Sequence, residues 1–155
     1  MKYLLSLVFL LSMPFYGLAQ DHKESPDSSG YHFNHKINEL NMATRALGYD
    51  LQREQMLSSD KREVLVINTP LKYASRYHFI IVGQPQSDKL KAKLSRGTIS
   101  EYFSKTIQSD KDTAYWMEFS FTCPESGIYS LELQQQGKKS KSSTYLALWV
   151  KRLDE

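Results

Sequence analysis

Beyond Lys61 the sequence alternates apolar and polar residues with a period of two, and this alternation most limits how the chain can fold. Successive side chains of a β-strand point to opposite faces of the sheet, so a period of two indicates strands with one buried face. Short stretches of turn residues interrupt the alternation and leave seven β-rich segments. The segments are residues 64–69, 77–83, 90–94, 99–105, 114–122, 127–134 and 144–151.

Short strands at this spacing favour an antiparallel sandwich, because parallel strands need a long crossover, usually a helix, between each pair. The chain has 155 residues, enough for one domain and too few for a multi-domain enzyme. We predict a mainly β fold over residues 61–155, a single antiparallel, jelly-roll-like β-sandwich of about seven to eight strands. Residues 134–143 are rich in Gln, Lys and Ser, which predicts a solvated hairpin loop.

A helical pattern precedes the strands. Residues 34–60 contain no proline, and two apolar stripes with helical spacing run along them. The first stripe is Ile37, Leu40, Leu47 and Leu51, and the second is Met42, Ala46, Tyr49 and Met56. We predict one amphipathic helix over residues 34–60, with Gly48 as the place where it would break. Residues 20–33 precede it as a flexible, polar leader.

Three of the expected strands are apolar on both faces. They contain residues 64–67, 78–82 and 145–150, and such strands need a cover on the outside of the sheet as well as a core inside. The amphipathic helix is the one element available to provide that cover. We therefore expect it to pack on the sheet.

The first nineteen residues resemble a signal peptide. Lys2 gives a positive start, an apolar run extends from Tyr3 to Phe15, and small residues precede Gln20. The run of about thirteen apolar residues is shorter than the ~20 that span a bilayer, so cleavage is favoured over a membrane anchor. No later apolar run is long enough to span. We expect a periplasmic or secreted protein.

Cys123 is the only cysteine, which excludes an internal disulfide and a cysteine-based zinc site. In the expected strand it lies on the same face as the neighbouring apolar residues. A buried, inert thiol is the expected state.

Charge and motifs do not indicate an enzyme. Lys and Arg number 20 and Asp and Glu 17, a formal net charge of +3 that is too small to predict nucleic-acid binding. The sequence contains no G-x-S-x-G, H-E-x-x-H, P-loop or G-x-G-x-x-G motif. One S-x-x-K sequence spans Ser58 to Lys61 in a polar turn, where a lowered lysine pKa is not expected. We predict no catalytic residue and no cofactor, with a small hydrolase as the third alternative.

The histidines do not form a predicted metal site. His32 and His35 are three residues apart but lack a third ligand, and His78 lies within an apolar strand. Cleavage before Gln20 would place His22 third in the chain, where the α-amine, two backbone nitrogens and its imidazole suit Cu(II) or Ni(II). Cyclisation of Gln20 to pyroglutamate removes that amine. We expect cyclisation, with metal binding at His22 as the alternative.

Two tryptophans on strand faces are candidate ligand-binding residues. Trp116 has the parity of Glu118 and Ser120, and Trp149 shares a face with Tyr145. Aromatic rings beside polar groups can stack on sugar rings, so Trp116, Tyr145 and Trp149 form a candidate binding surface. The alternative is that these rings pack beneath the helix.

Residues 77–83 (YHFIIVG), 89–94 (KLKAKL) and 119–131 (FSFTCPESGIYSL) share a pattern with a known group of domains. The pattern resembles the jelly-roll sandwich of bacterial pre-peptidase C-terminal domains and extends over roughly residues 64–150. The resemblance implies a non-catalytic accessory module with no catalytic residues to transfer. The long helix before the sheet departs from the pattern.

These observations predict a non-catalytic, exported accessory or interaction module of the bacterial cell envelope. The expected partner is an envelope protein or a glycan. A carbohydrate-binding module that uses exposed aromatic residues is the main alternative.

Overall fold

The computed structural model describes residues 28–60, 62–85, 87–98, 100–108, 115–137 and 141–153. The expected signal peptide and His22 lie outside these residues. In this part of the chain a helix is followed by eight strands. The elements are α1 (Ser28–Ala46), β1 (Asp50–Asp60), β2 (Val64–Leu71), β3 (Ser75–Gly83), β4 (Ser87–Arg96), β5 (Ser100–Gln108), β6 (Tyr115–Thr122), β7 (Gly127–Gly137) and β8 (Lys141–Arg152).

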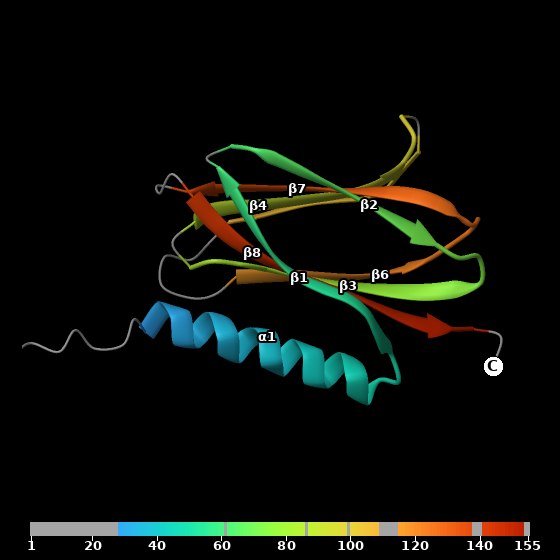
Figure 1. Cartoon of the computed structure of the whole chain (residues 1–155), viewed down its shortest axis with the longest axis horizontal. Helices are drawn as coiled ribbons and strands as arrows, with labels where there is room; N and C mark the ends of the chain where they lie inside the picture. The colour runs from blue at the N-terminus through green and yellow to red at the C-terminus, as the bar shows by residue number, and fades with distance from the viewer. Residues whose placement is uncertain are drawn as a thin grey trace, which may run out of the picture.

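The strands form two four-stranded sheets. Sheet A has the order β1-β8-β3-β6, sheet B has the order β2-β7-β4-β5, and every pairing is antiparallel. This order is that of an eight-stranded jelly roll, so the predicted fold class is confirmed. All seven expected strands are present, and β1 is the eighth. Figure 1 shows α1 along the outer side of sheet A, whereas no described element lies over sheet B.

The main core lies between the two sheets. Buried side chains alternate along facing strands, among them Phe79 and Leu148 from sheet A and Leu90 and Leu131 from sheet B. A second apolar cluster lies between α1 and the outer face of sheet A. It consists of Phe33, Ile37, Leu40, Tyr49, Ile80, Val82, Tyr145, Ala147 and Trp149. The predicted cover is therefore confirmed for β3 and β8. It is wrong for β2, the third strand expected to need a cover, because β2 lies in sheet B, where Val64 and Val66 are exposed on the outer face.

The predicted helix over residues 34–60 is wrong at both ends. α1 begins at Ser28, within the expected leader, because Phe33 is buried against the sheet and extends the packed face toward the N-terminus. It ends at Ala46 because Gly48 has a φ of 80°, which an L side chain rarely adopts. The Gly48 amide donates to the Arg45 carbonyl (2.9 Å) and the Tyr49 amide to the Thr44 carbonyl (3.5 Å).

The residues after this break form a strand. β1 occupies the second half of the predicted helix and pairs with β8 from Asp50 to Asp60. The apolar stripes change accordingly. Ile37 and Leu40 are buried as predicted, but Leu47 is 65% exposed and Leu51 lies at the exposed edge of sheet A. Leu47 therefore does not help to hold the helix on the sheet.

A polar network crosses the interior at one end of the sandwich. Gln135, expected in a solvated loop, is only 2% exposed because β7 continues to Gly137. We orient its amide by its hydrogen bonds. Its oxygen accepts from the hydroxyls of Ser87 (2.5 Å) and Tyr115 (3.0 Å), and its nitrogen donates to the Ser143 carbonyl (3.0 Å) and the Thr144 hydroxyl. These bonds link sheet A to sheet B and satisfy polar groups that burial would otherwise leave unpaired.

We expect Gly83→Ala to lower the free energy of unfolding by about 1–3 kcal/mol, because the new methyl group overpacks the interior. A Cβ at residue 83 would lie 2.6 Å from the buried ring of Tyr115 and would push it away from Gln135. Urea denaturation measures the loss. In a Tyr115→Ala background the same substitution should have little effect, and an equal loss in both backgrounds would contradict the steric explanation.

Candidate functional site

The three aromatic residues predicted for ligand binding lie in two different environments. Trp116, on the edge strand β6, is 39% exposed. Trp149 and Tyr145, on β8, are 1% and 6% exposed and lie in the cluster beneath α1. Each alternative therefore holds for part of the set. Trp116 lies on the surface, whereas Tyr145 and Trp149 pack under the helix.

Tyr145 fixes the helix to the sheet through hydrogen bonds. The Asn41 amide of α1 donates to the Tyr145 hydroxyl (2.6 Å), which donates to a carboxylate oxygen of Glu54 on β1 (3.0 Å). Burial raises the pKa of Tyr145 to about 12, with Glu54 adding to the effect and Asn41 opposing it. At neutral pH the hydroxyl keeps its proton and acts as the donor to Glu54.

Trp149 packs beneath the helix. Its ring lies under the C-terminal half of α1, with the Arg45 guanidinium 6.0 Å from the ring centroid. Its indole nitrogen is buried and has no hydrogen-bond partner among the described residues. The ring is therefore a packing element of the helix interface.

The exposed tryptophan lies at one end of a row of polar side chains that come from α1, β6 and β3. The Lys36 ammonium of α1 is 4.1 Å from the centroid of the Trp116 ring and also pairs with Glu39 at 2.7 Å. Glu118 and Ser120 follow Trp116 on the same face of β6, as predicted. We name this set, together with His78 on β3, the Trp116 strip: Lys36, His78, Trp116, Glu118 and Ser120.

His78 connects the polar members of the strip. It lies opposite Ser120 in the β3–β6 ladder, with 3.0 Å between its Nδ1 and the Ser120 hydroxyl, and its Nε2 is 3.4 Å from a Glu118 oxygen. The Tyr49 ring packs on the imidazole, with 5.6 Å between the centroids. His78 is therefore a half-buried strand residue with a polar side chain near each ring nitrogen.

Ser120, His78 and Glu118 are the residue types of a hydrolytic triad. In such triads the carboxylate that orients the histidine is buried, whereas Glu118 is about half exposed. The S-x-x-K alternative has no support either, because Ser58 is an exposed residue near the end of β1. The strip contains a hydroxyl, an imidazole, a carboxylate and an ammonium, all of which can form hydrogen bonds.

The sequence alone groups Trp116, Glu118 and Ser120 but does not point to Lys36. Strand parity places the first three on one face, a relation that is local in sequence. Lys36 reaches Trp116 only because α1 crosses sheet A with this side toward β6. No sequence signal predicts that rotation.

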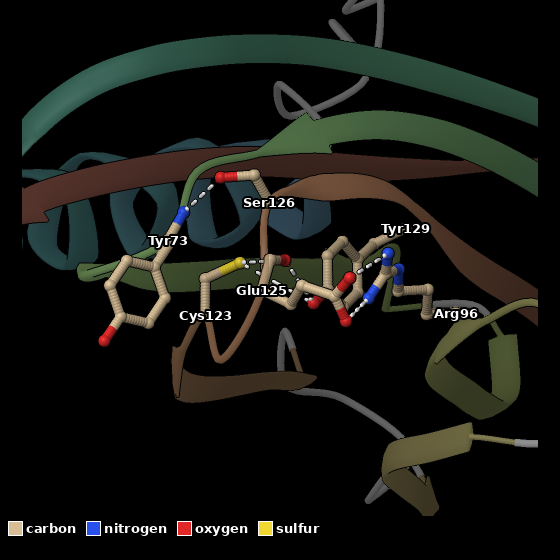
Figure 2. A network of polar contacts seen from close by, with 6 residues as sticks. All are labelled: Tyr73, Arg96, Cys123, Glu125, Ser126 and Tyr129. Atoms are coloured by element: carbon tan, nitrogen blue, oxygen red, sulfur yellow. Dashed lines mark hydrogen bonds and ion pairs between the residues drawn. The ribbon is translucent and has the colours of Figure 1, made fainter.

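A second polar cluster lies at the β6–β7 turn (Figure 2). The Arg96 guanidinium of β4 binds both carboxylate oxygens of Glu125, one at 3.1 Å, and lowers the pKa of that carboxyl. The Glu125 carbonyl accepts from the Tyr129 hydroxyl (2.9 Å) and the Cys123 thiol (3.2 Å). Burial raises the pKa of Tyr129.

These contacts hold the turn in place. The Ser126 hydroxyl accepts from the Tyr73 amide (2.8 Å), so the β6–β7 turn is tied to the β2–β3 turn, as Figure 2 shows. Cys123 is buried and free of disulfide bonds, as predicted. The groups of this cluster bind one another, and we assign it a structural role.

The described residues contain no group of three or more histidine, cysteine, aspartate or glutamate side chains that could hold a metal. His32 and His35 are exposed on α1. Within the same residues, no helix has both the length and the apolar content needed to cross a membrane.

Comparison with known proteins found similarity to solved structures only. No protein-family model matches the chain, and no curated protein matches it. A CBM4 structure is 13% identical, with a TM-score of 0.39, over 63% of this chain and 74% of that chain. The carbohydrate-binding module CBM6cm-2 of Cellvibrio mixtus lichenase 5A, in complex with cellotriose, is 8% identical, with a TM-score of 0.38, over 64% of this chain and 88% of that one. Neither is a pre-peptidase C-terminal domain.

Proposed function

We propose that this protein is a non-catalytic binding module that binds a neutral glycan at the Trp116 strip. The observation that carries the proposal is the exposed Trp116 ring, with the Lys36 ammonium 4.1 Å from its centroid and Glu118 next to it on the same face of β6. An aromatic ring excludes water from the apolar face of a sugar ring, and neighbouring polar groups bind its hydroxyls. Tyr145 and Trp149 support the site indirectly, because they hold the helix that carries Lys36.

The polar groups of the strip suit a neutral sugar better than a charged one. Lys36 and Glu118 carry opposite charges, and Glu39 already pairs with Lys36. A sugar hydroxyl can accept a hydrogen bond from the ammonium and donate one to the carboxylate. A ligand without net charge can therefore bind both charged groups.

The place of action is the cell envelope or the extracellular space. The expected signal peptide over residues 1–19 supports export, and glycans are abundant in that location. Within this proposal an envelope glycan is the partner. The alternative partner is an envelope protein that buries Trp116 in its interface, as tryptophan often is in protein complexes.

We expect Trp116→Ala to abolish or weaken glycan binding by about tenfold or more, because the stacking surface is lost. The probes are cellohexaose, chitohexaose and mannohexaose, tested with the purified protein by isothermal titration calorimetry. Trp116→Phe should retain part of the affinity, since a smaller ring still stacks. The tryptophan fluorescence of the wild-type protein should change when the sugar binds.

Tyr73→Ala is the matched control, because Tyr73 is an exposed aromatic residue at the other end of the sandwich. It should bind these sugars like the wild type. Binding that survives Trp116→Ala unchanged would exclude this site. No binding to any glycan, with capture of an envelope protein that depends on Trp116, would favour the protein partner.

A further inference from the structure

The outer face of sheet B carries a row of lysines. Lys89, Lys91 and Lys93 alternate along β4 with the buried residues Leu90 and Ala92, so all three side chains leave the same face of the sheet. No described element packs over this face, and α1 lies on the other side of the sandwich (Figure 1).

Strand register gives the neighbours of each lysine. Lys91 lies between Gln134 of β7 and Thr106 of β5, and Lys93 lies between Glu132 and Ser104. β2 completes these rows, with Val64 beside Gln134. We name this surface the lysine face: Val64, Val66, Lys89, Lys91, Lys93, Ser104, Thr106, Gln108, Glu132, Gln134 and Gln136.

The charges on this face are arranged unevenly. Lys93 is 3.9 Å from Glu132 and 3.8 Å from Glu101, so two carboxylates offset its charge. Lys89 and Lys91 contact no carboxylate within the described residues. Their neighbours in the rows are neutral amides and hydroxyls, so one half of the face is positive and rich in hydrogen-bonding groups.

We propose that the lysine face binds an acidic polysaccharide, a polymer of uronic acid units, along β4 and β7. The Lys89 and Lys91 ammonium groups would bind carboxylates of the polymer, and Gln134, Gln136 and Thr106 would bind its hydroxyls. A shallow depression lined by Val64, Lys91, Lys93, Glu132 and Gln134 lies in the middle of this face. Exposed ion pairs are individually weak, so a polymer with many carboxylates fits this surface better than a single sugar acid.

The same observations disfavour a nucleic acid. The lysine face contains no aromatic residue on which bases could stack. None of its eleven residues is an arginine, the residue that binds phosphate with two parallel hydrogen bonds, although Arg62 lies at its end, where its carbonyl accepts from Gln134. Two lysines beside amides match widely spaced carboxylates better than a dense row of phosphates.

Binding to immobilised polygalacturonate, measured by biolayer interferometry at low salt, tests the proposal. We expect the wild-type protein to bind, and we expect about 0.3 M NaCl to weaken binding strongly because exposed charges are screened. The double variant Lys89→Gln/Lys91→Gln should bind about tenfold more weakly. Both side chains are exposed, so folding should not change.

The control is Lys72→Gln/Lys105→Gln, which has the same net charge. Lys72 lies after β2, and Lys105 has the opposite parity on β5, beside Ala92. The control should bind polygalacturonate like the wild type, and an equal loss in both variants would overturn the proposal. So would the absence of polygalacturonate binding, or tighter binding to duplex DNA.

The lysine face is independent of the Trp116 strip, which lies on the opposite sheet. Trp116→Ala should leave polygalacturonate binding unchanged, and Lys89→Gln/Lys91→Gln should leave neutral glycan binding unchanged. Loss of polygalacturonate binding in Trp116→Ala would place the acidic ligand at the Trp116 strip and overturn the assignment to the lysine face.

Discussion

Trp149→Ala is expected to lower the free energy of unfolding by about 3–5 kcal/mol, the usual cost of removing a large buried aromatic side chain. The ring is 1% exposed and lies between sheet A and α1. Because its indole nitrogen has no partner among the described residues, the substitution breaks no hydrogen bond of that group. The expected loss therefore comes from the cavity and from the contacts of the ring with the helix.

Urea denaturation followed by far-UV circular dichroism measures this loss without relying on tryptophan fluorescence. Trp116→Ala is the comparison, and it should cost less than about 1 kcal/mol because the ring is half exposed and loses mainly its contact with Lys36. Trp149→Phe should lie between the wild type and Trp149→Ala. Equal losses for the two alanine variants would contradict the placement of Trp149 beneath the helix.

Strand positions were predictable because parity is a local property of the backbone. Lys89, Lys91 and Lys93 alternate with Leu90 and Ala92 in the sequence, and in β4 the two apolar residues are buried while the lysines lie on the other face. The same reasoning identified the exposed side of β6. Apolar residues on both faces also predicted a covering helix, correctly for β3 and β8 but wrongly for β2, whose outer residues Val64 and Val66 are exposed.

That a strand follows α1 was not predictable in the same way. Leu51 and Met56 continue a helical stripe, yet both belong to β1, which is an edge strand with little burial of its own. Its conformation comes from pairing with β8 at the far end of the chain. Gly48 marked the break correctly, but the local sequence does not show that the next element is a strand.

The candidate site was partly predictable for a related reason. Trp116, Glu118 and Ser120 share one strand, so their proximity follows from parity alone. Lys36 and His78 join them through tertiary contacts. Gln135 shows the opposite error, because its polar surroundings in the sequence predicted a loop, whereas hydrogen bonds to Ser87 and Tyr115 compensate for its burial.

Ile37→Asp is the second large effect that we expect, a loss of about 3 kcal/mol or more. Ile37 is buried in the middle of the contact between α1 and sheet A, beside Phe33 and Leu40 in the same cluster. A carboxylate at this position would either remain unpaired among apolar groups or force the helix off the sheet, and both outcomes are costly. If the helix leaves, Trp149 becomes exposed to water.

Leu47→Asp is the matched control, since it introduces the same charge immediately after the last residue of α1. Leu47 is largely exposed, so we expect a loss within about 1 kcal/mol, most of it from a negative charge near the helix C-terminus. Urea denaturation gives both values, and a red shift of the Trp149 emission in a Trp116→Phe background reports release of the helix. An Ile37→Asp protein as stable as Leu47→Asp, with unshifted emission, would show that α1 does not depend on this face for its attachment to sheet A.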